Sequence, residues 1–279
     1  MKFIEFLKAI LLGIVEGITE WLPVSSTGHM ILLDEFISLD VSGEFLEMFL
    51  VVIQLGAILA VPVLFWDRLY PFSKKKSREE RDAALSLWGK VIVGAIPAAI
   101  FGVLLDDILE AHLYNYVTVA VALIVYGVAF IAVERFNKKK SFRVESVESL
   151  TYTDALRIGA FQVLSLIPGT SRSGSTILGG ILTGVSRTAS AEFSFFMAIP
   201  IMLGASGLKI LKFILGGFTA TGAELLLLLT GIAVSFLVSF FVIRFLMDFV
   251  KRHDFSVFGI YRIALGVIVI GYFIIKTFA

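Results

Sequence analysis

Five long apolar runs constrain this chain more than any other feature of its sequence. They cover residues 46–65, 117–133, 189–215, 225–249 and 257–275. A helix rises about 1.5 Å per residue, so about 20 apolar residues cross the roughly 30 Å hydrocarbon core of a bilayer. A soluble protein would interrupt such runs with polar residues every few positions. Together with 58% hydrophobic and only 17% charged residues, the runs predict an all-α integral membrane protein.

The charge and cysteine content exclude several classes of function. The formal net charge is +1, and the basic residues form short clusters between the apolar runs, which argues against a nucleic-acid partner. The sequence has no cysteine, which excludes disulfides, a thiolate nucleophile and a thiolate metal site. The N-terminal apolar run continues into Glu16 and Glu20 without a small-residue cleavage pattern, so we expect it to belong to the mature fold.

About ten apolar segments can be drawn, and two neighbouring pairs among them each contain an arm that is too short to span. The segments lie near residues 3–22, 27–37, 45–65, 88–105, 116–133, 154–167, 173–185, 189–215, 224–249 and 255–278. The first pair is interrupted at 23–28 and the second at 168–174, and both interruptions begin with proline. Because lipid cannot satisfy backbone polar groups outside a helix, we interpret both pairs as re-entrant helix pairs buried in protein.

The two interruptions resemble each other, which predicts an internal duplication. Pro23-Val24-Ser25-Ser26 matches Pro168-Gly169-Thr170-Ser171 at a spacing of 145 residues. We expect one polytopic membrane domain over 1–279, with repeat one at about 1–135 and repeat two at about 150–279. Each repeat would hold one re-entrant pair and three transmembrane helices. Because that number of spans is odd, the second repeat would be inverted relative to the first.

The charges of the connecting segments predict the orientation in the membrane. The segments 68–82 and 134–150 are rich in lysine and arginine, so the positive-inside rule places both in the cytoplasm. The connection between them contains Asp106, Asp107, Glu110 and His112 and is expected outside. The first re-entrant pair then enters from outside and the second from inside, and their tips are expected to meet near the midplane.

Charged and hydroxylated residues beside the first interruption predict a chemical site. Glu16 and Glu20 share one face of an apolar helix, and a charge at membrane depth costs at least about 2.5–3.5 kcal/mol, so they need a cationic partner or a divalent ion. Ser25-Ser26-Thr27-Gly28-His29 brings hydroxyls near an imidazole, the minimal nucleophile and base. The alternatives are carboxylates that face the headgroups and a histidine with a purely structural role.

The second interruption supplies a cation. Gly169-Thr170-Ser171-Arg172-Ser173-Gly174 surrounds one arginine with small hydroxylated residues and glycines. Backbone N–H groups, hydroxyls and a guanidinium fork together suit a phosphate. The alternative is a glycine-rich helix crossing from which Arg172 extends to the membrane interface. If the two tips meet, the residues predict a site for a phosphorylated lipid.

The segments Glu16–His29 and Pro168–Gly174 closely resemble the two signature segments of the undecaprenyl-diphosphate phosphatase family, also called the bacitracin-resistance family. The resemblance covers both motifs, their spacing, the length and the hydropathy. It implies hydrolysis of undecaprenyl diphosphate to undecaprenyl phosphate and inorganic phosphate, which recycles the lipid carrier for peptidoglycan synthesis and confers bacitracin resistance. It also implies a bacterial plasma-membrane protein whose active site faces the extracytoplasmic side.

The resemblance also implies roles for individual residues. Glu16 and Glu20 would hold a divalent cation, Mg²⁺ or Ca²⁺, or the attacking group. Ser26 would be the nucleophile with His29 as its base, although His29 could itself be phosphorylated. Arg172 would hold the diphosphate. The residues expected to line the substrate site with it are Ser25, Thr27, Gln162, Gly169, Thr170, Ser171 and Ser173.

One function of another class stays open at this point, as does the oligomeric state. Inverted repeats with broken helices are common in secondary transporters, so the same site could serve a flippase of a polyprenyl phosphate. A nucleophile and a base beside the arginine favour the phosphatase, because transport alone needs neither. The expected partners are a polyprenyl diphosphate lipid and the bilayer, and the sequence is compatible with a homodimer.

Overall fold

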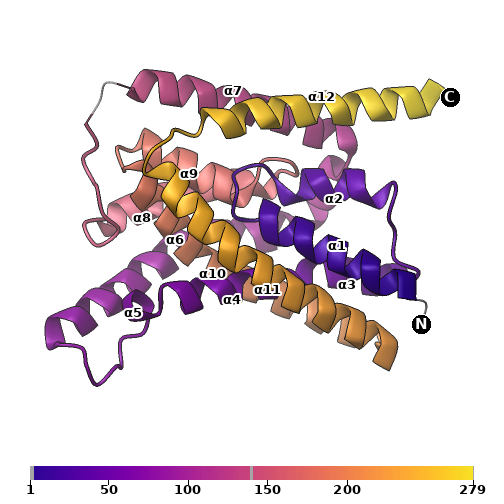
Figure 1. Cartoon of the computed structure of the whole chain (residues 1–279), viewed down its shortest axis with the longest axis horizontal. Coiled ribbons are helices and arrows are strands. Elements are labelled where there is room, and N and C mark those ends of the chain that lie inside the picture. The colour runs from indigo at the N-terminus through magenta and orange to yellow at the C-terminus, as the bar shows by residue number, and fades with distance from the viewer. Residues whose placement is uncertain (1–2, 139–140, 279) are drawn as a thin grey trace.

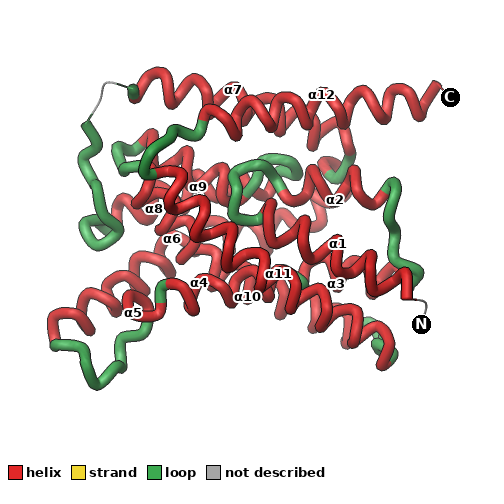
Figure 2. The backbone as a smooth tube through the Cα atoms, viewed as in Figure 1, coloured by secondary structure: helices red, strands yellow, loops and turns green. Residues whose placement is uncertain are grey.

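The computed structural model describes residues 3–138 and 141–278, which are helical almost throughout (Figure 2). The helices are, in chain order, α1 (Phe3–Thr19), α2 (Ser26–Asp34), α3 (Gly43–Val52), α4 (Gln54–Leu64), α5 (Trp66–Leu69), α6 (Arg78–Leu113), α7 (Tyr116–Asn137), α8 (Tyr152–Val163), the 3₁₀ turn η1 (Leu164–Leu166), α9 (Arg172–Leu182), α10 (Arg187–Leu215), α11 (Gly222–Val250) and α12 (Ser256–Phe278). Lys139 and Lys140 of the predicted basic loop, and the side chains of Asp106, Asp107 and Glu110, lie outside the described part of the structure.

Six helical stretches among the described residues are long and apolar enough to cross a membrane, which confirms the predicted all-α membrane fold. They are Gly43–Leu64, Arg78–Leu105, Tyr116–Asn137, Arg187–Leu215, Gly222–Val250 and Ser256–Thr277. The first of them combines α3 and α4, which meet at Ile53. Helices α1, α2, α8 and α9 have 17, 9, 12 and 11 residues. These four are the arms of the two predicted re-entrant pairs.

Helix α6 is longer at both ends than the apolar segment predicted at 88–105. A capping box starts the helix at Ser77, whose hydroxyl accepts from the N–H of Glu80 while the Glu80 carboxylate accepts from the N–H of Ser77. At the other end the helix continues to Leu113, so the acidic segment 106–112 is helical and not a connection. No proline or glycine occurs there to stop the helix. The connection to α7 shrinks to Tyr114 and Asn115.

The contacts between helices follow the predicted duplication. Helix α1 packs parallel to α11 from the other half, and α8 packs in the same way on α6. A β-carbon on Gly13 would lie 2.8 Å from the carbonyl oxygen of Gly231, and one on Gly159 would lie 2.2 Å from that of Gly94. Gly13 and Gly159 are 146 positions apart. Each half therefore places the first helix of its re-entrant pair on a helix of the other half.

The last helices of the two halves, α7 and α12, lie side by side and run in opposite directions (Figure 1). Tyr116 at the start of α7 stacks on Phe273 near the end of α12, with ring centroids 4.2 Å apart. Phe130 near the end of α7 contacts Phe255 just before α12, at 5.9 Å. This antiparallel pair supports the predicted inversion, whereas superposition of the complete halves stays a prediction.

Ion pairs gather at one end of the bundle, beside the two predicted cytoplasmic segments. Arg68 pairs with Glu192 of α10 at 2.6 Å. Arg187 Nε, at the start of α10, donates to the carboxylate of Glu134 at 2.9 Å. Arg143 also pairs with Asp154 of α8. The charged residues at or after the ends of α4 and α7 thus form ion pairs with helices of the second half. The start of α10 lies at this end of the molecule.

Candidate active site

The two helix interruptions share an unusual backbone that directs their side chains toward each other. Ser25 and Ser171 have φ angles of +73° and +72°, in the left-handed region that non-glycine residues rarely adopt. Each caps the helix that follows, because the Ser25 and Ser171 hydroxyls accept from the N–H groups of Gly28 and Gly174. The residues that begin α2 and α9 are therefore Ser26 and Arg172.

This pair of serines corrects the predicted alignment of the repeats. Ser25 and Ser171 are 146 residues apart, one more than the 145 that separate Pro23 from Pro168. The second loop holds one more residue between its proline and its capping serine. In the corrected register Ser26 corresponds to Arg172 and Glu16 to Gln162. The positions that correspond in this register thus differ in chemistry, and each half contributes a different functional group.

Glu20 connects the two halves at the center of the site. Its Oε1 accepts from Nη2 of Arg172 at 2.9 Å and from Nε at 3.2 Å, and its Oε2 accepts from the Ser26 hydroxyl at 3.2 Å. The Glu20 and Arg172 side chains are 8% and 10% exposed. The two motifs predict a cationic partner for the carboxylates, which Arg172 provides, whereas the Ser26 hydroxyl on the second oxygen of Glu20 is an addition from the structure.

Further contacts fix the guanidinium of Arg172. Its Nη1 donates to the carbonyl oxygen of Ser194 in α10 at 2.7 Å and lies 3.2 Å from the Ser194 hydroxyl. The guanidinium also lies over the ring of Trp21, 5.6 Å from its centroid. Arg172 is thus held from three sides inside the protein, and the alternative in which it extends to the membrane interface is wrong.

Glu16 lies one helical turn before Glu20 and is 1% exposed. Its Oε1 is buried without a hydrogen-bond partner among the described residues. A buried carboxylate oxygen in this state can take a metal ion, a water molecule or a substrate donor as its ligand. Glu16 therefore faces the interior of the site and does not face the headgroups.

A cavity of about 550 Å³ begins at these residues and reaches the surface. Glu16, Ser26 and Thr27 line its inner part, where the Glu16 side chain is fully buried. Apolar side chains from three helices form much of its wall, namely Met30, Ile31, Leu50, Val51, Ala205 and Leu208. The remaining lining residues are Glu47, Gln54, Tyr114, Lys209 and Lys212. The cavity thus combines a polar end with an apolar wall.

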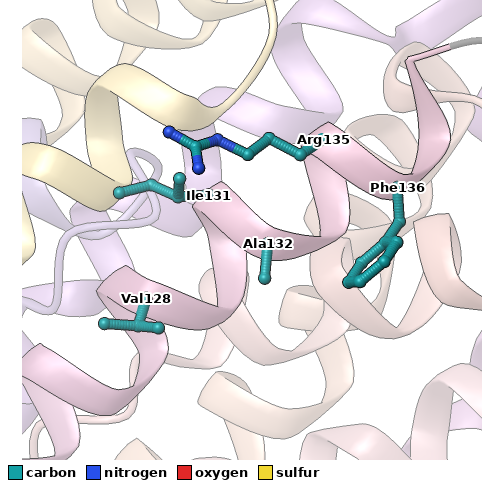
Figure 3. A pocket seen from close by; sticks show the side chains of 5 residues that line it. All are labelled: Val128, Ile131, Ala132, Arg135 and Phe136. Atoms are coloured by element: carbon teal, nitrogen blue, oxygen red, sulfur yellow. The ribbon is translucent and has the colours of Figure 1, made fainter.

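A second hollow, of about 580 Å³, lies on the surface of α7 and is not a candidate site (Figure 3). Five residues of this one helix line it, and Arg135 is the one polar side chain among them. Val128 and Phe136 in its wall are 53% and 77% exposed, as expected for a surface that faces lipid. None of the predicted site residues lines it.

The imidazole of His29 forms hydrogen bonds with groups other than the Ser26 hydroxyl. Its Nδ1 bonds the carbonyl oxygen of Ser25 at 2.7 Å, and its Nε2 bonds the hydroxyl of Tyr261 at 2.7 Å. Since a carbonyl can only accept, Nδ1 carries the hydrogen and Nε2 of the neutral ring accepts from Tyr261. Both ring nitrogens are occupied, and neither contacts Ser26. The Ser26 hydroxyl donates to Glu20 in this structure, and the role of His29 as its base stays a prediction.

Most of the other predicted substrate residues are packed inside the protein, and one of them joins the two loops. The Ser173 hydroxyl donates to the carbonyl oxygen of Glu20 at 3.0 Å and joins one loop to the other. Gly169 adopts a φ of +89°, and a β-carbon there would lie 2.5 Å from the carbonyl oxygen of Val119. Thr170 is buried. Of the seven predicted lining residues, Thr27 is the one that lines the cavity.

Gln162 does not line the cavity either, against the prediction that it faces the same space as the two carboxylates. It is fully buried, and neither atom of its amide has a hydrogen-bond partner among the described residues. Gln162 lies on α8 at the position that corresponds to Glu16 on α1. We have no physical account of its unpaired amide.

Sequence reasoning missed Arg262 of α12, which joins the two interruptions. Its Nη1 donates to the carbonyl oxygen of Pro23 at 3.1 Å, and its Nη2 donates to those of Gly169 and Thr170 at 2.8 and 2.9 Å. The side chain is fully buried, with the guanidinium over the ring of Tyr126. An arginine inside an apolar run is itself a signal, because buried charge in a membrane segment marks a functional position.

Comparisons of this sequence with known families and proteins agree with the family that the two motifs indicate. Residues 9–268 match the family described as bacitracin resistance protein BacA. An Enterococcus faecalis protein named undecaprenyl-diphosphatase is 58% identical over 272 residues, which cover 97% of this chain and 98% of that protein. Proteins of the same name from Desulfitobacterium hafniense and Acetivibrio thermocellus are 57% identical over 278 residues (99% of both chains) and 58% identical over 271 residues (97% and 98%). This chain therefore belongs to the bacitracin resistance protein BacA family.

Proposed function

We propose that this protein is a membrane phosphatase that hydrolyses undecaprenyl diphosphate to undecaprenyl phosphate and inorganic phosphate. The observation that supports this most directly is the chain of contacts from Arg172 through Glu20 to Ser26 at the inner end of the cavity. Relatives of nearly equal length bear the name undecaprenyl-diphosphatase. The physiological result is the return of the lipid carrier to peptidoglycan synthesis, and with it resistance to bacitracin.

The proposed reaction has two steps. Glu20 Oε2 takes the proton of the Ser26 hydroxyl, and Oγ attacks the terminal phosphorus while the phosphoanhydride bond to the lipid phosphate breaks. Undecaprenyl phosphate leaves as the first product, and the proton on Glu20 passes to its departing phosphate oxygen, which restores the carboxylate. Water, deprotonated by the same carboxylate, then attacks the phosphoserine, and the proton returns to Ser26 as inorganic phosphate leaves. Arg172 binds phosphate oxygens throughout and neutralises the charge that develops on them.

We further propose a divalent cation, Mg²⁺ or Ca²⁺, at Glu16 and Glu20. Both ions prefer oxygen ligands, and Mg²⁺ in particular is held by one or two carboxylates together with substrate phosphates. The buried Oε1 of Glu16, which has no partner among the described residues, fits this requirement. When bound, the cation would neutralise phosphate charge and polarise the bond that breaks.

The cavity is proposed to open on the extracytoplasmic side of the bacterial plasma membrane. Its lining includes Tyr114 after α6 and Lys209 and Lys212 near the end of α10. Arg187, at the opposite end of α10, pairs with Glu134 beside a predicted cytoplasmic segment. The positive-inside rule applied to the basic segments then places the cavity opening outside.

A lipid flippase is the second candidate function, because the paired re-entrant helices resemble those of transporters. It would use Arg172 to bind a phosphate. It would not need the Ser26 hydroxyl on the carboxylate of Glu20, a contact of 3.2 Å that suits hydrolysis. This contact favours the phosphatase.

Phosphate release from a long-chain prenyl diphosphate by the purified protein tests the proposal. We expect release that depends on a divalent cation, that stops with EDTA and that falls at least about 100-fold in Ser26→Ala and Glu20→Gln. Ser146→Ala changes a hydroxyl in the segment between the halves, where it bonds Ser149, and should leave the rate unchanged. A folded wild-type protein that releases no phosphate, yet moves prenyl phosphate across vesicles, would establish the flippase instead.

A further inference from the structure

The exposed end of the cavity contains two lysines that the proposed reaction does not use. Lys209 and Lys212 lie near the end of α10 and line the cavity together with Glu47 of α3. Lys209 Nζ lies 3.1 Å from Glu47 Oε2, and the two side chains are 32% and 66% exposed. Glu16, which lines the same cavity, is 1% exposed. The cavity therefore runs from a dry carboxylate to a partly solvated charged rim.

Basic residues at this end need an explanation. Lys209 lies 22 residues after Arg187, which corresponds to roughly 33 Å along a helix axis. It is therefore near the face of the membrane opposite the basic segments, where the positive-inside rule disfavours lysine. Two other lysines of the described residues at that face are paired with local carboxylates, Lys8 with Glu5 and Lys276 with Glu35. Lys209 is likewise paired, with Glu47, but Lys209 and Lys212 line the cavity, whereas Lys8 and Lys276 do not.

We infer that Lys209 and Lys212 form a second anion subsite, which binds the diphosphate head group of the lipid before it reaches Arg172. This inference rests on the proposed function and adds a residue pair that determines substrate capture. The ion pair with Glu47 is largely exposed, and such pairs contribute about 0–1 kcal/mol. Phosphate oxygens can therefore replace the carboxylate at Lys209 with little loss.

The apolar lining of the cavity suits a lipid whose head group binds first at the two lysines. Leu208 precedes Lys209, and Leu208, Leu50 and Met30 line the same cavity as the two lysines. A prenyl chain can contact these apolar side chains while its head group contacts the ammonium groups. The head group then moves inward to Arg172, where its terminal phosphate meets Ser26. The lysines bind substrate and take no part in the bond cleavage.

Steady-state kinetics of phosphate release from a prenyl diphosphate test the inference. We expect Lys209→Gln and Lys212→Gln each to raise KM about fivefold with kcat within about twofold of wild type, because a partly exposed charge contact contributes about 1 kcal/mol. The decrease of kcat/KM with added NaCl should become shallower in both variants. Lys209→Arg keeps the charge and should keep the wild-type KM.

Two control variants separate this effect from a general change of charge or fold. Lys251→Gln removes a lysine at the opposite end, where Lys251 pairs with the exposed Asp248, and should leave both constants unchanged. Glu47→Gln removes the carboxylate that competes with substrate for Lys209 and should lower KM or leave it unchanged. A KM that stays at the wild-type value in both lysine variants, or a kcat that falls while KM does not change, would overturn the inference.

Direct binding separates this inference from the proposed function. Binding of a fluorescent prenyl diphosphate to the same preparations requires no turnover. If the wild type binds this lipid without releasing phosphate, the phosphatase is refuted, and a fivefold weaker and less salt-dependent binding in the lysine variants still supports the subsite. Equal binding by wild type and variants overturns the subsite even if phosphate release proceeds.

Discussion

Replacement of Arg262 by methionine tests whether one side chain holds both helix interruptions in place. The guanidinium donates to three backbone carbonyl oxygens, of Pro23, Gly169 and Thr170. Each buried carbonyl left without its donor costs about 1–3 kcal/mol. Three such losses amount to about 3–9 kcal/mol, and local rearrangement should keep the cost near the lower half of that range, about 3–6 kcal/mol.

The expected consequence is a loss of both stability and activity. At about 2–4 °C per kcal/mol for a chain of this size, Arg262→Met should lower the unfolding temperature in detergent by about 6–24 °C. Because Ser26 and Arg172 follow the two loops directly, even a displacement of about 1 Å should reduce kcat by about 100-fold. Arg262→Lys keeps one cation with a shorter reach, and we expect an intermediate effect.

Thermal unfolding followed by intrinsic tryptophan fluorescence, together with phosphate release at 25 °C, measures both effects. Arg244→Met provides the matched control, since Arg244 lies over the ring of Phe240 on the exposed side of α11. It should shift the unfolding temperature by no more than about 2 °C. If Arg262→Met unfolded within about 2 °C of wild type and retained its kcat, the two loops would not depend on this arginine and the reasoning would be refuted.

Three further predictions concern the inner site. Arg172→Lys should lower kcat by about 100-fold, because an ammonium cannot make the two contacts of the guanidinium with Glu20; rates near wild type would contradict this. Glu16→Gln should raise the Mg²⁺ concentration needed for half-maximal phosphate release at least about tenfold, and an unchanged requirement would exclude Glu16 as a ligand. Tyr261→Phe removes the hydroxyl on Nε2 of His29 and should change kcat by less than about threefold; a 100-fold loss would restore His29 to the proton transfer.

The sequence predicted the membrane spans and the gathering of Glu20, Ser26 and Arg172, for physical reasons that are local. Apolar length fixes a span, and breaks with proline and serine at membrane depth must be buried. Charges at that depth require partners, so the carboxylate beside one break and the arginine in the other are expected to meet. Oε1 of Glu20 and Nη2 of Arg172 lie 2.9 Å apart.

Other features depend on orientation and long-range packing, which spacing alone does not determine. Ser26 and His29 are three residues apart in α2, yet His29 bonds the carbonyl four residues before it and Tyr261 of a distant helix. The contacts of Arg262 join residues more than 90 positions apart. The one-residue difference between the loops became visible through the left-handed backbone of Ser25 and Ser171.

The glycine contacts between the halves have a consequence for how this protein is made. Helix α1 emerges first from the ribosome, but its close partner on α11, at Gly231, is synthesised more than 200 residues later. Until α11 is inserted, the N-terminal re-entrant pair can pack only against helices of its own half, such as α4 and α7. The nascent first half therefore stays incompletely packed until the second half is synthesised, and its site cannot form before then.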